Sequence, residues 1–312
     1  MPAQTDTLLR YRPWRGTLRG PGWAAAAMAR ASVTLLARRR LYWGLFALVL
    51  LVFFFFFYGQ YLVVWITTQT ADDTVLIGGV KVPVANFTKF LDRLALNGTD
   101  HTFGNFIWFE GYVVVILLAL AGSVLVGNDF HHGSLPFYLA KPIGRWHYVL
   151  GKCLGIGIVI NLATTVPAVA LWVEAGLLYD WQTYYFDNLD LLAGVLGYGL
   201  VLTVTLSLLV VATAVWVRQT VPMVMVWMGL FVLLRLLAGW LVDGLKADPE
   251  WRLIDLWNDL YLVGLWCLQA DPATVRPQPQ PAYWQAAVVV AGVCGACAGY
   301  LRRRVQAVEI IG

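Results

Sequence analysis

The residues whose side chains could take part in chemistry lie mostly in one short polar stretch, residues 127–152, between two long apolar runs. Asp129 stands there beside His131 and His132, and these are residue types that bind metals. Adjacent histidines point in different directions on a helix, however, and no further ligand is close in sequence. We therefore expect no metal site in this stretch.

Two further patterns resemble reactive motifs without meeting their requirements. Residues 144–152 have the wrong glycine spacing for a phosphate-binding loop, and Cys153 replaces the required Ser or Thr. Cys294 and Cys297 have C-x-x-C spacing, but they lie inside an apolar run, whereas redox and zinc motifs lie in polar turns. The chain is therefore expected neither to bind and split ATP alone nor to use a disulfide framework.

The same stretch has the features of a structured docking loop. Its three cations, Lys141, Arg145 and Lys152, outnumber the single acid Asp129, which predicts a cytoplasmic location. Gly133 and Ser134 offer a turn and an N-cap, and Pro136 is tolerated in the first turn of a helix. A short apolar helix would follow, with an end at Pro142; it would contain Leu135, Phe137, Tyr138 and Leu139.

The order of these residues resembles the signature loop of ABC transporter permeases of the type-2 export class. The resemblance implies that residues 133–141 form a coupling helix that docks in a groove of a separate ATPase subunit. It also implies that Asp129 and Arg145 brace the loop, through a salt bridge, and that Gly151 lets the next span approach a neighbour. The implied coupling residues are Asp129, Gly133, Ser134, Leu135, Phe137, Tyr138, Leu139, Pro142, Arg145, Gly151 and Lys152.

Composition places the whole chain in the membrane. Of the 312 residues, 60% are hydrophobic and 13% are charged, whereas soluble domains have about 45–50% and about 25%. Hydropathy predicts an all-α integral membrane protein with six transmembrane helices. Basic residues concentrate at the predicted inner segments, so both termini are predicted to be cytoplasmic. The predicted spans are residues 41–66, 108–126, 149–173, 191–217, 221–242 and 283–301, which form a single transmembrane domain over residues 1–312 without a nucleotide-binding domain.

The segments outside the spans carry their own predictions. Residues 23–36 read as an amphipathic interfacial helix before Arg38-Arg39-Arg40. Residues 74–84 predict a small extracytoplasmic hairpin, and a short helix is expected from Asn86. Apolar residues recur at helical spacing after residue 250, which predicts either an amphipathic helix in the outer interface or a re-entrant pair; they are Trp251, Ile254, Trp257, Tyr261 and Leu265.

A few residues inside the spans deserve separate interpretation. Gly151 and Gly155 form a small-residue face suited to close helix contact. Polar groups in mid-membrane can line a pathway or bond to a neighbouring helix; the candidates are Asn161, Thr164, Thr165 and Arg235. Arg235 could also pair with Glu174 or Asp243, or extend to the outer surface.

The leading hypothesis is the permease subunit of an ABC exporter in a bacterial inner membrane, without catalytic activity or a cofactor of its own. Its expected partners are ATPase subunits that carry ATP and Mg²⁺, a second permease copy or a similar permease, and membrane lipids; no nucleic acid is expected. A second hypothesis is a membrane enzyme acting on lipid, with Glu174, Asp180 and Asp187 as candidate acids. A third is a scaffold that docks an ATPase but transports nothing.

Overall fold

The computed structural model describes residues 20–67, 74–77, 80–83, 95–127, 129, 144–179 and 181–305. In this part of the chain, six helices are long and apolar enough to cross a membrane. They are Arg40–Ile66, Asp100–Gly127, Trp146–Leu178, Leu189–Val217, Thr220–Gly244 and Tyr283–Arg304. The prediction of six helices able to span a membrane is therefore confirmed, and these helices extend beyond the predicted bounds by up to eight residues.

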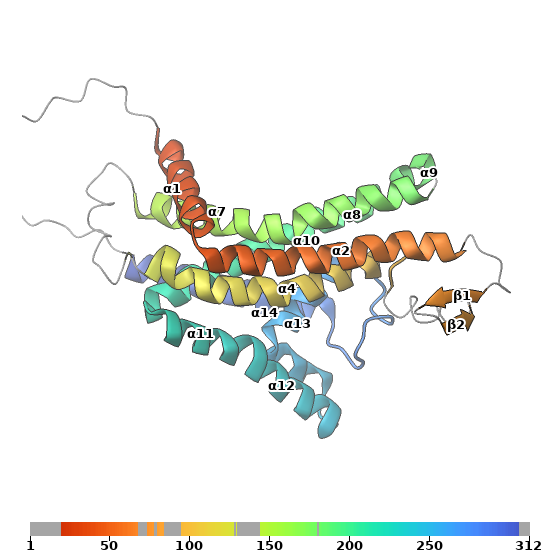
Figure 1. Cartoon of the computed structure of the whole chain (residues 1–312). Coiled ribbons are helices and arrows are strands. Elements are labelled where there is room, and N and C mark those ends of the chain that lie inside the picture. The colour runs from red at the N-terminus through yellow and green to blue at the C-terminus, as the bar shows by residue number, and fades with distance from the viewer. Residues whose placement is uncertain are drawn as a thin grey trace, which may run out of the picture.

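The helices run between two distinct ends of the molecule (Figure 1). We call one the basic end, since it holds Arg38–Arg40 and the Arg302–Arg304 turn, and the other the hairpin end. The elements in chain order are α1 (Pro21–Ala37), α2 (Arg40–Thr67), β1 (Thr74–Ile77), β2 (Val80–Pro83), α4 (Asp100–Gly122), η1 (Ser123–Gly127), α7 (Arg145–Ala163), α8 (Thr165–Leu178), α9 (Trp181–Asp187), α10 (Leu189–Val217), α11 (Thr220–Met228), η2 (Gly229–Leu233), α12 (Leu234–Gly239), η3 (Trp240–Gly244), η4 (Pro249–Ile254), α13 (Leu256–Cys267) and α14 (Tyr283–Arg304).

The hairpin predicted after the first span is present. Strand β1 pairs antiparallel with β2, with Thr74 opposite Pro83 and Ile77 opposite Val80. The β-branched residues in these strands favour extended backbone. The helix expected from Asn86 lies outside the described residues.

Helix α4 begins at Asp100, eight residues before the predicted start of the second span. The early start has a local cause, because the side chain of Thr102 accepts a hydrogen bond from the backbone N–H of Thr99 at 3.2 Å. This bond satisfies a backbone donor that would otherwise be orphaned at the helix N-terminus. Hydropathy alone misses this because the first turns of α4 contain polar residues.

The centre of the bundle is α10, whose core face is apolar and fully buried. It packs against α7, α13 and α14. Four of its side chains, Tyr198, Leu202, Leu206 and Val210, are 0% exposed. Because lipid is as apolar as these side chains, their close van der Waals packing rather than removal from water holds the helices together here.

Helix α13 lies inside the bundle rather than on its surface. Every residue from Leu256 to Leu265 is buried, so this part of the helix leaves no face exposed to an interface. Gly111 of α4 makes room for it, since a Cβ atom there would lie 1.7 Å from Trp257 Cζ2. The hypothesis of an interfacial amphipathic helix is therefore wrong for α13, and the re-entrant alternative fits its burial.

Helix α2 and the fifth span, which begins with α11, are largely exposed. Leu51 and Phe55 of α2 are exposed, and so are Val221 and Met225 of α11. Figure 1 shows α11 and α12 diverging from the rest of the bundle toward the hairpin end. Large apolar surfaces of this kind suit contact with lipid or with another protein chain.

Candidate functional site: the base of the loop between the second and third spans

The loop singled out by its sequence leaves η1 at the basic end and returns through α7. Gly133, Ser134, Leu135, Phe137, Tyr138, Leu139 and Pro142 lie outside the described residues. Arg145 begins α7, and its side chain also lies outside the described part of the structure. Asp129, Gly151 and Lys152 are described, so the structure shows where the two ends of the loop are held.

An ion pair joins the two ends of this loop. Lys152 Nζ of α7 lies 2.7 Å from Asp129 Oδ2, and the Lys152 side chain is 9% exposed. Tyr148 Oη donates a second hydrogen bond to the same Asp129 oxygen at 2.9 Å. The Lys152 ammonium also donates to the carbonyl oxygen of Leu125 in η1. We call these four residues the loop base.

The loop base is held together by charge-assisted hydrogen bonds. A charge-assisted hydrogen bond is stronger than a neutral one, and removal of one partner from a buried pair costs roughly 3–5 kcal/mol. The loop base therefore ties the start of the loop to both η1 and α7. The resemblance assigned the bracing role to Asp129 with Arg145, whereas the described partners of Asp129 are Lys152 and Tyr148.

Both the first and the last residue of η1 contact the region where α10 ends and α11 begins. Ser123 Oγ lies 2.8 Å from Thr220 Oγ1 at the start of α11. A Cβ atom on Gly127 would lie 2.7 Å from the carbonyl oxygen of Arg218. Arg218 itself has a φ of 61°, which is the left-handed conformation that ends α10. This close approach links the loop to the fifth span.

Gly151 and Gly155 form the close helix contact that their spacing predicts, and the partner is α1. A Cβ atom at Gly151 would lie 2.9 Å from Met28 Cβ, and one at Gly155 would lie 2.8 Å from Ser32 Cβ. The absence of side chains therefore lets α1 cross directly over the start of α7. Figure 1 shows this crossing at the basic end. The N-terminal helix is consequently anchored one turn from the loop base.

The polar residues in the third span bond within the bundle. Asn161 Nδ2 donates to Thr203 Oγ1 of α10 at 2.7 Å, and Thr165 Oγ1 donates to Asn161 Oδ1 at 2.7 Å. Thr164 Oγ1 donates to the carbonyl oxygen of Ile160 at 2.9 Å, where α7 ends and α8 begins. These bonds support the alternative in which the polar groups bond within the helix bundle. That the three residues line a transport pathway stays a prediction.

Arg235 lies in α12 and takes a partner that the sequence did not suggest. Its guanidinium carbon lies 4.5 Å from the centroid of the Trp108 ring of α4, an attractive cation–π geometry. Asp243 instead pairs with Arg252 at 2.6 Å, so the pairing of Arg235 with Asp243 is wrong. Arg252 lies in η4, which follows Asp243 closely in the chain and places the Arg252 guanidinium beside the Asp243 carboxylate.

These groups surround a cavity of about 320 Å³ near the hairpin end. Asp255 also lines it and caps α13 by accepting a hydrogen bond from the backbone N–H of Trp257 at 3.1 Å. Burial raises the pKa of Asp255, and the nearby charge of Arg235 opposes that rise. The cavity is thus lined by cations and carboxylates that largely balance one another.

Two further acidic residues, which the sequence patterns did not single out, are buried in the bundle. Glu110 of α4 and Asp259 of α13 are both 0% exposed. Their carboxyl oxygens have no hydrogen-bond partner among the described residues. Burial, reinforced by the negative charge of Asp255, raises the pKa of Asp259 to about 9. The signal that could have found Glu110 is a lone acid within an apolar run.

Glu174 is a further departure from the predicted layout. The sequence placed it in the second outer loop, but it lies in α8 and is only 7% exposed. The third span runs to Leu178 and therefore includes Glu174. Among the residues that the structure describes, no group of three or more His, Cys, Asp or Glu side chains could hold a metal ion.

The six spans, the crossing N-terminal helix and the braced loop define a multi-pass membrane protein of the permease type. The chain belongs to the ABC-2 family transporter proteins, since the model of that family matches residues 28–252. The match begins within α1 and includes the first five spans and the loop. No curated protein matches the chain.

Proposed function

We propose that this protein is the membrane subunit of an ABC exporter and that a separate ATPase docks on the loop between its second and third spans. Family membership supports the transport role. The observation that carries the docking role is the loop base, where Asp129 and Lys152 tie the loop to two spans at once. A soluble subunit that moves this loop would thereby move η1 and α7.

The mechanism follows from differential stabilisation of two states. An ATPase dimer that closes on ATP would displace the loops, and the loop base would pass that displacement to the spans. The contact of η1 with Thr220 extends the same displacement to α11. Nucleotide then favours one of two access states without any chemistry in this chain. Two copies, or this chain with a similar permease, would form the pathway in the inner membrane of a bacterium.

Co-purification tests this proposal. The full chain would be tagged and extracted gently from its native membrane, and soluble partners with ATP-binding motifs would be identified by mass spectrometry. The test variant carries Tyr138→Asp and Leu139→Asp in the loop. The matched control carries Phe186→Asp and Leu189→Asp, which make the same kind of change at exposed positions near the hairpin end.

We expect an ATPase to co-purify with the wild type and the control and to be lost from the test variant. No ATPase in any preparation would contradict the proposal. Activity on lipid in the absence of nucleotide would favour the enzyme alternative, although Glu174 is buried and is poorly placed to act there. ATP hydrolysis that stays insensitive to every substrate would favour the scaffold alternative.

A further inference from the structure

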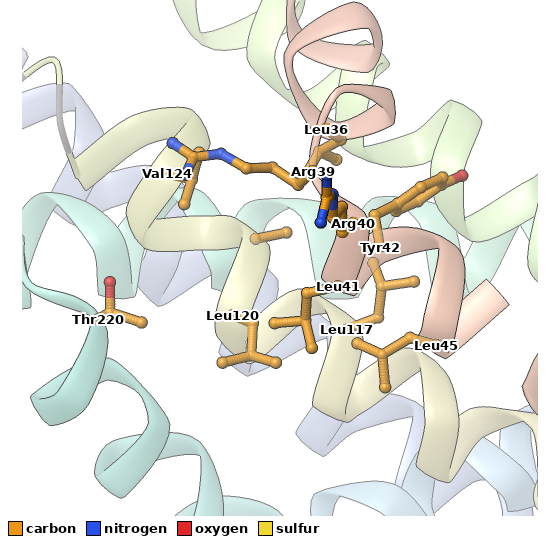
Figure 2. A pocket seen from close by; sticks show the side chains of 11 residues that line it. Leu36, Arg39, Arg40, Leu41, Tyr42, Leu45, Leu117, Leu120, Val124 and Thr220 are labelled. Carbon is orange, nitrogen blue, oxygen red and sulfur yellow. The ribbon is translucent and has the colours of Figure 1, made fainter.

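A second feature of the basic end lies outside the loop. An open cavity of about 220 Å³ is bordered by the junction of α1 and α2, by α4 and η1, and by the start of α11. Figure 2 shows Arg39 and Arg40 on one side of this cavity and leucine side chains on the other. The leucines Leu41, Leu45, Leu117 and Leu120 give it an aliphatic floor.

The charge around this cavity is unbalanced. No Asp or Glu occurs between residues 20 and 67. Arg39 and Arg40 form no ion pair with any other residue that the structure describes. Both arginines are exposed, so their guanidinium groups are available to a ligand. Two cations beside an apolar floor lack a counter-ion within the described part of the chain.

Two helix N-termini add to this positive potential. Helix α2 begins at Arg40 and α11 begins at Thr220, and both residues line the cavity. Neither helix has an acidic residue in its first turn. A helix N-terminus favours anions, so both helix ends attract the same kind of ligand as the two arginines.

We propose that this cavity binds an anionic phospholipid of the membrane. The lipid phosphate would lie against Arg39 and Arg40, and a segment of one acyl chain would lie on the leucine floor. A free phosphate would satisfy the arginines but leave the aliphatic floor unused. The predicted position of the α1–α2 junction at the inner membrane surface matches the level of lipid headgroups. This inference does not depend on docking of an ATPase.

Lipid titration of the purified full chain tests the inference. Phosphatidylglycerol, phosphatidylcholine with the same acyl chains, and inorganic phosphate would each be added in neutral detergent. Bound lipid would be measured by native mass spectrometry and thermal stabilisation by the unfolding midpoint. The variants are Arg39→Gln with Arg40→Gln, and Leu120→Trp, which fills the floor. The matched control is Arg302→Gln with Arg303→Gln, since these arginines are also exposed in the last turn of α14.

We expect phosphatidylglycerol to bind the wild type and the control with equal affinity and to stabilise both. Loss of the two cavity arginines should weaken its binding by roughly tenfold to thirtyfold. Leu120→Trp should weaken binding while leaving the arginines in place. Three results would overturn the inference: equal stabilisation by phosphatidylcholine, equal stabilisation by inorganic phosphate, or an equal loss in the α14 control. A lower dimer fraction in the Arg39/Arg40 variant, with unchanged lipid selectivity, would also overturn it, because the cavity would then lie between two copies.

Discussion

The ammonium group of Lys152 lies 2.7 Å from the Asp129 carboxylate, across a loop that separates two membrane spans. The same ammonium donates to the Leu125 carbonyl in η1. One cation therefore holds the exit of the second span, the start of the loop and the beginning of the third span together. The consequences of this arrangement can be measured.

Lys152→Met should lower the free energy of unfolding by about 3 kcal/mol, because it leaves the Asp129 carboxylate without its counter-ion. The double variant Lys152→Met/Asp129→Asn should be more stable than Lys152→Met alone, because it leaves no unpaired charge. Thermal unfolding of the purified chain in detergent measures both effects. Equal stability of Lys152→Met and the wild type would show that the ion pair contributes nothing.

Gly155→Val should destabilise the protein by about 1–3 kcal/mol, because its side chain would collide with Ser32 and push α1 off α7. The matched control is Gly292→Val in α14, where an added Cβ meets nothing within 4 Å. The control should change stability by less than about 1 kcal/mol, the scale of helix propensity. Protease sensitivity near Arg30 would report separation of α1. Equal effects of the two substitutions would refute the close contact.

Arg235 and Trp108 should be energetically coupled by about 0.5–2 kcal/mol. A double-mutant cycle with Arg235→Gln and Trp108→Leu measures this coupling through unfolding midpoints. The control cycle pairs Arg276→Gln with Trp108→Leu, since Arg276 is exposed and lies in the last connecting segment. Coupling in the control as large as that in the test cycle would mean that the effect is not specific to the stacked pair.

Asp259 should make stability fall as pH rises. Its folded-state pKa of about 9 exceeds its ordinary value near 4, so the folded protein holds a proton that the unfolded chain has released between these pH values. The unfolding free energy should then decrease by up to about 1.4 kcal/mol per pH unit over that window. Asp259→Asn should flatten this dependence and raise the unfolding midpoint at pH 8. An unchanged slope in the variant would contradict a protonated Asp259.

Much of the fold could be predicted from the sequence because membrane spans depend on local composition. The apolar run before Glu174 marked the third span, and the two β-prone runs marked the hairpin. Partner choice could not be predicted in the same way. Gly151 indicated a close contact, but its partner α1 is fixed only by how two helices cross in space.

The buried acids illustrate a different limit. A single carboxyl group hardly changes the average hydropathy of a long span, so hydropathy does not single out Glu110 as a buried acid. The sequence pattern around Asp259 left an interfacial helix and a re-entrant pair equally open, and only the packing of α13 inside the bundle buries this carboxyl group. Electrostatics favours an acidic partner or an extended position for Arg235, whereas in the structure its guanidinium lies over the Trp108 ring.

Photo-crosslinking from the loop tests the central claim most directly. A photoreactive phenylalanine analogue would replace Tyr138 in one preparation and Phe186 in another, and each would be irradiated in native membranes with and without ATP. The account predicts that position 138 captures a soluble ATPase, with a yield that changes on addition of ATP, and that position 186 does not. Capture of the ATPase from neither position, or equally from both, would contradict docking on this loop.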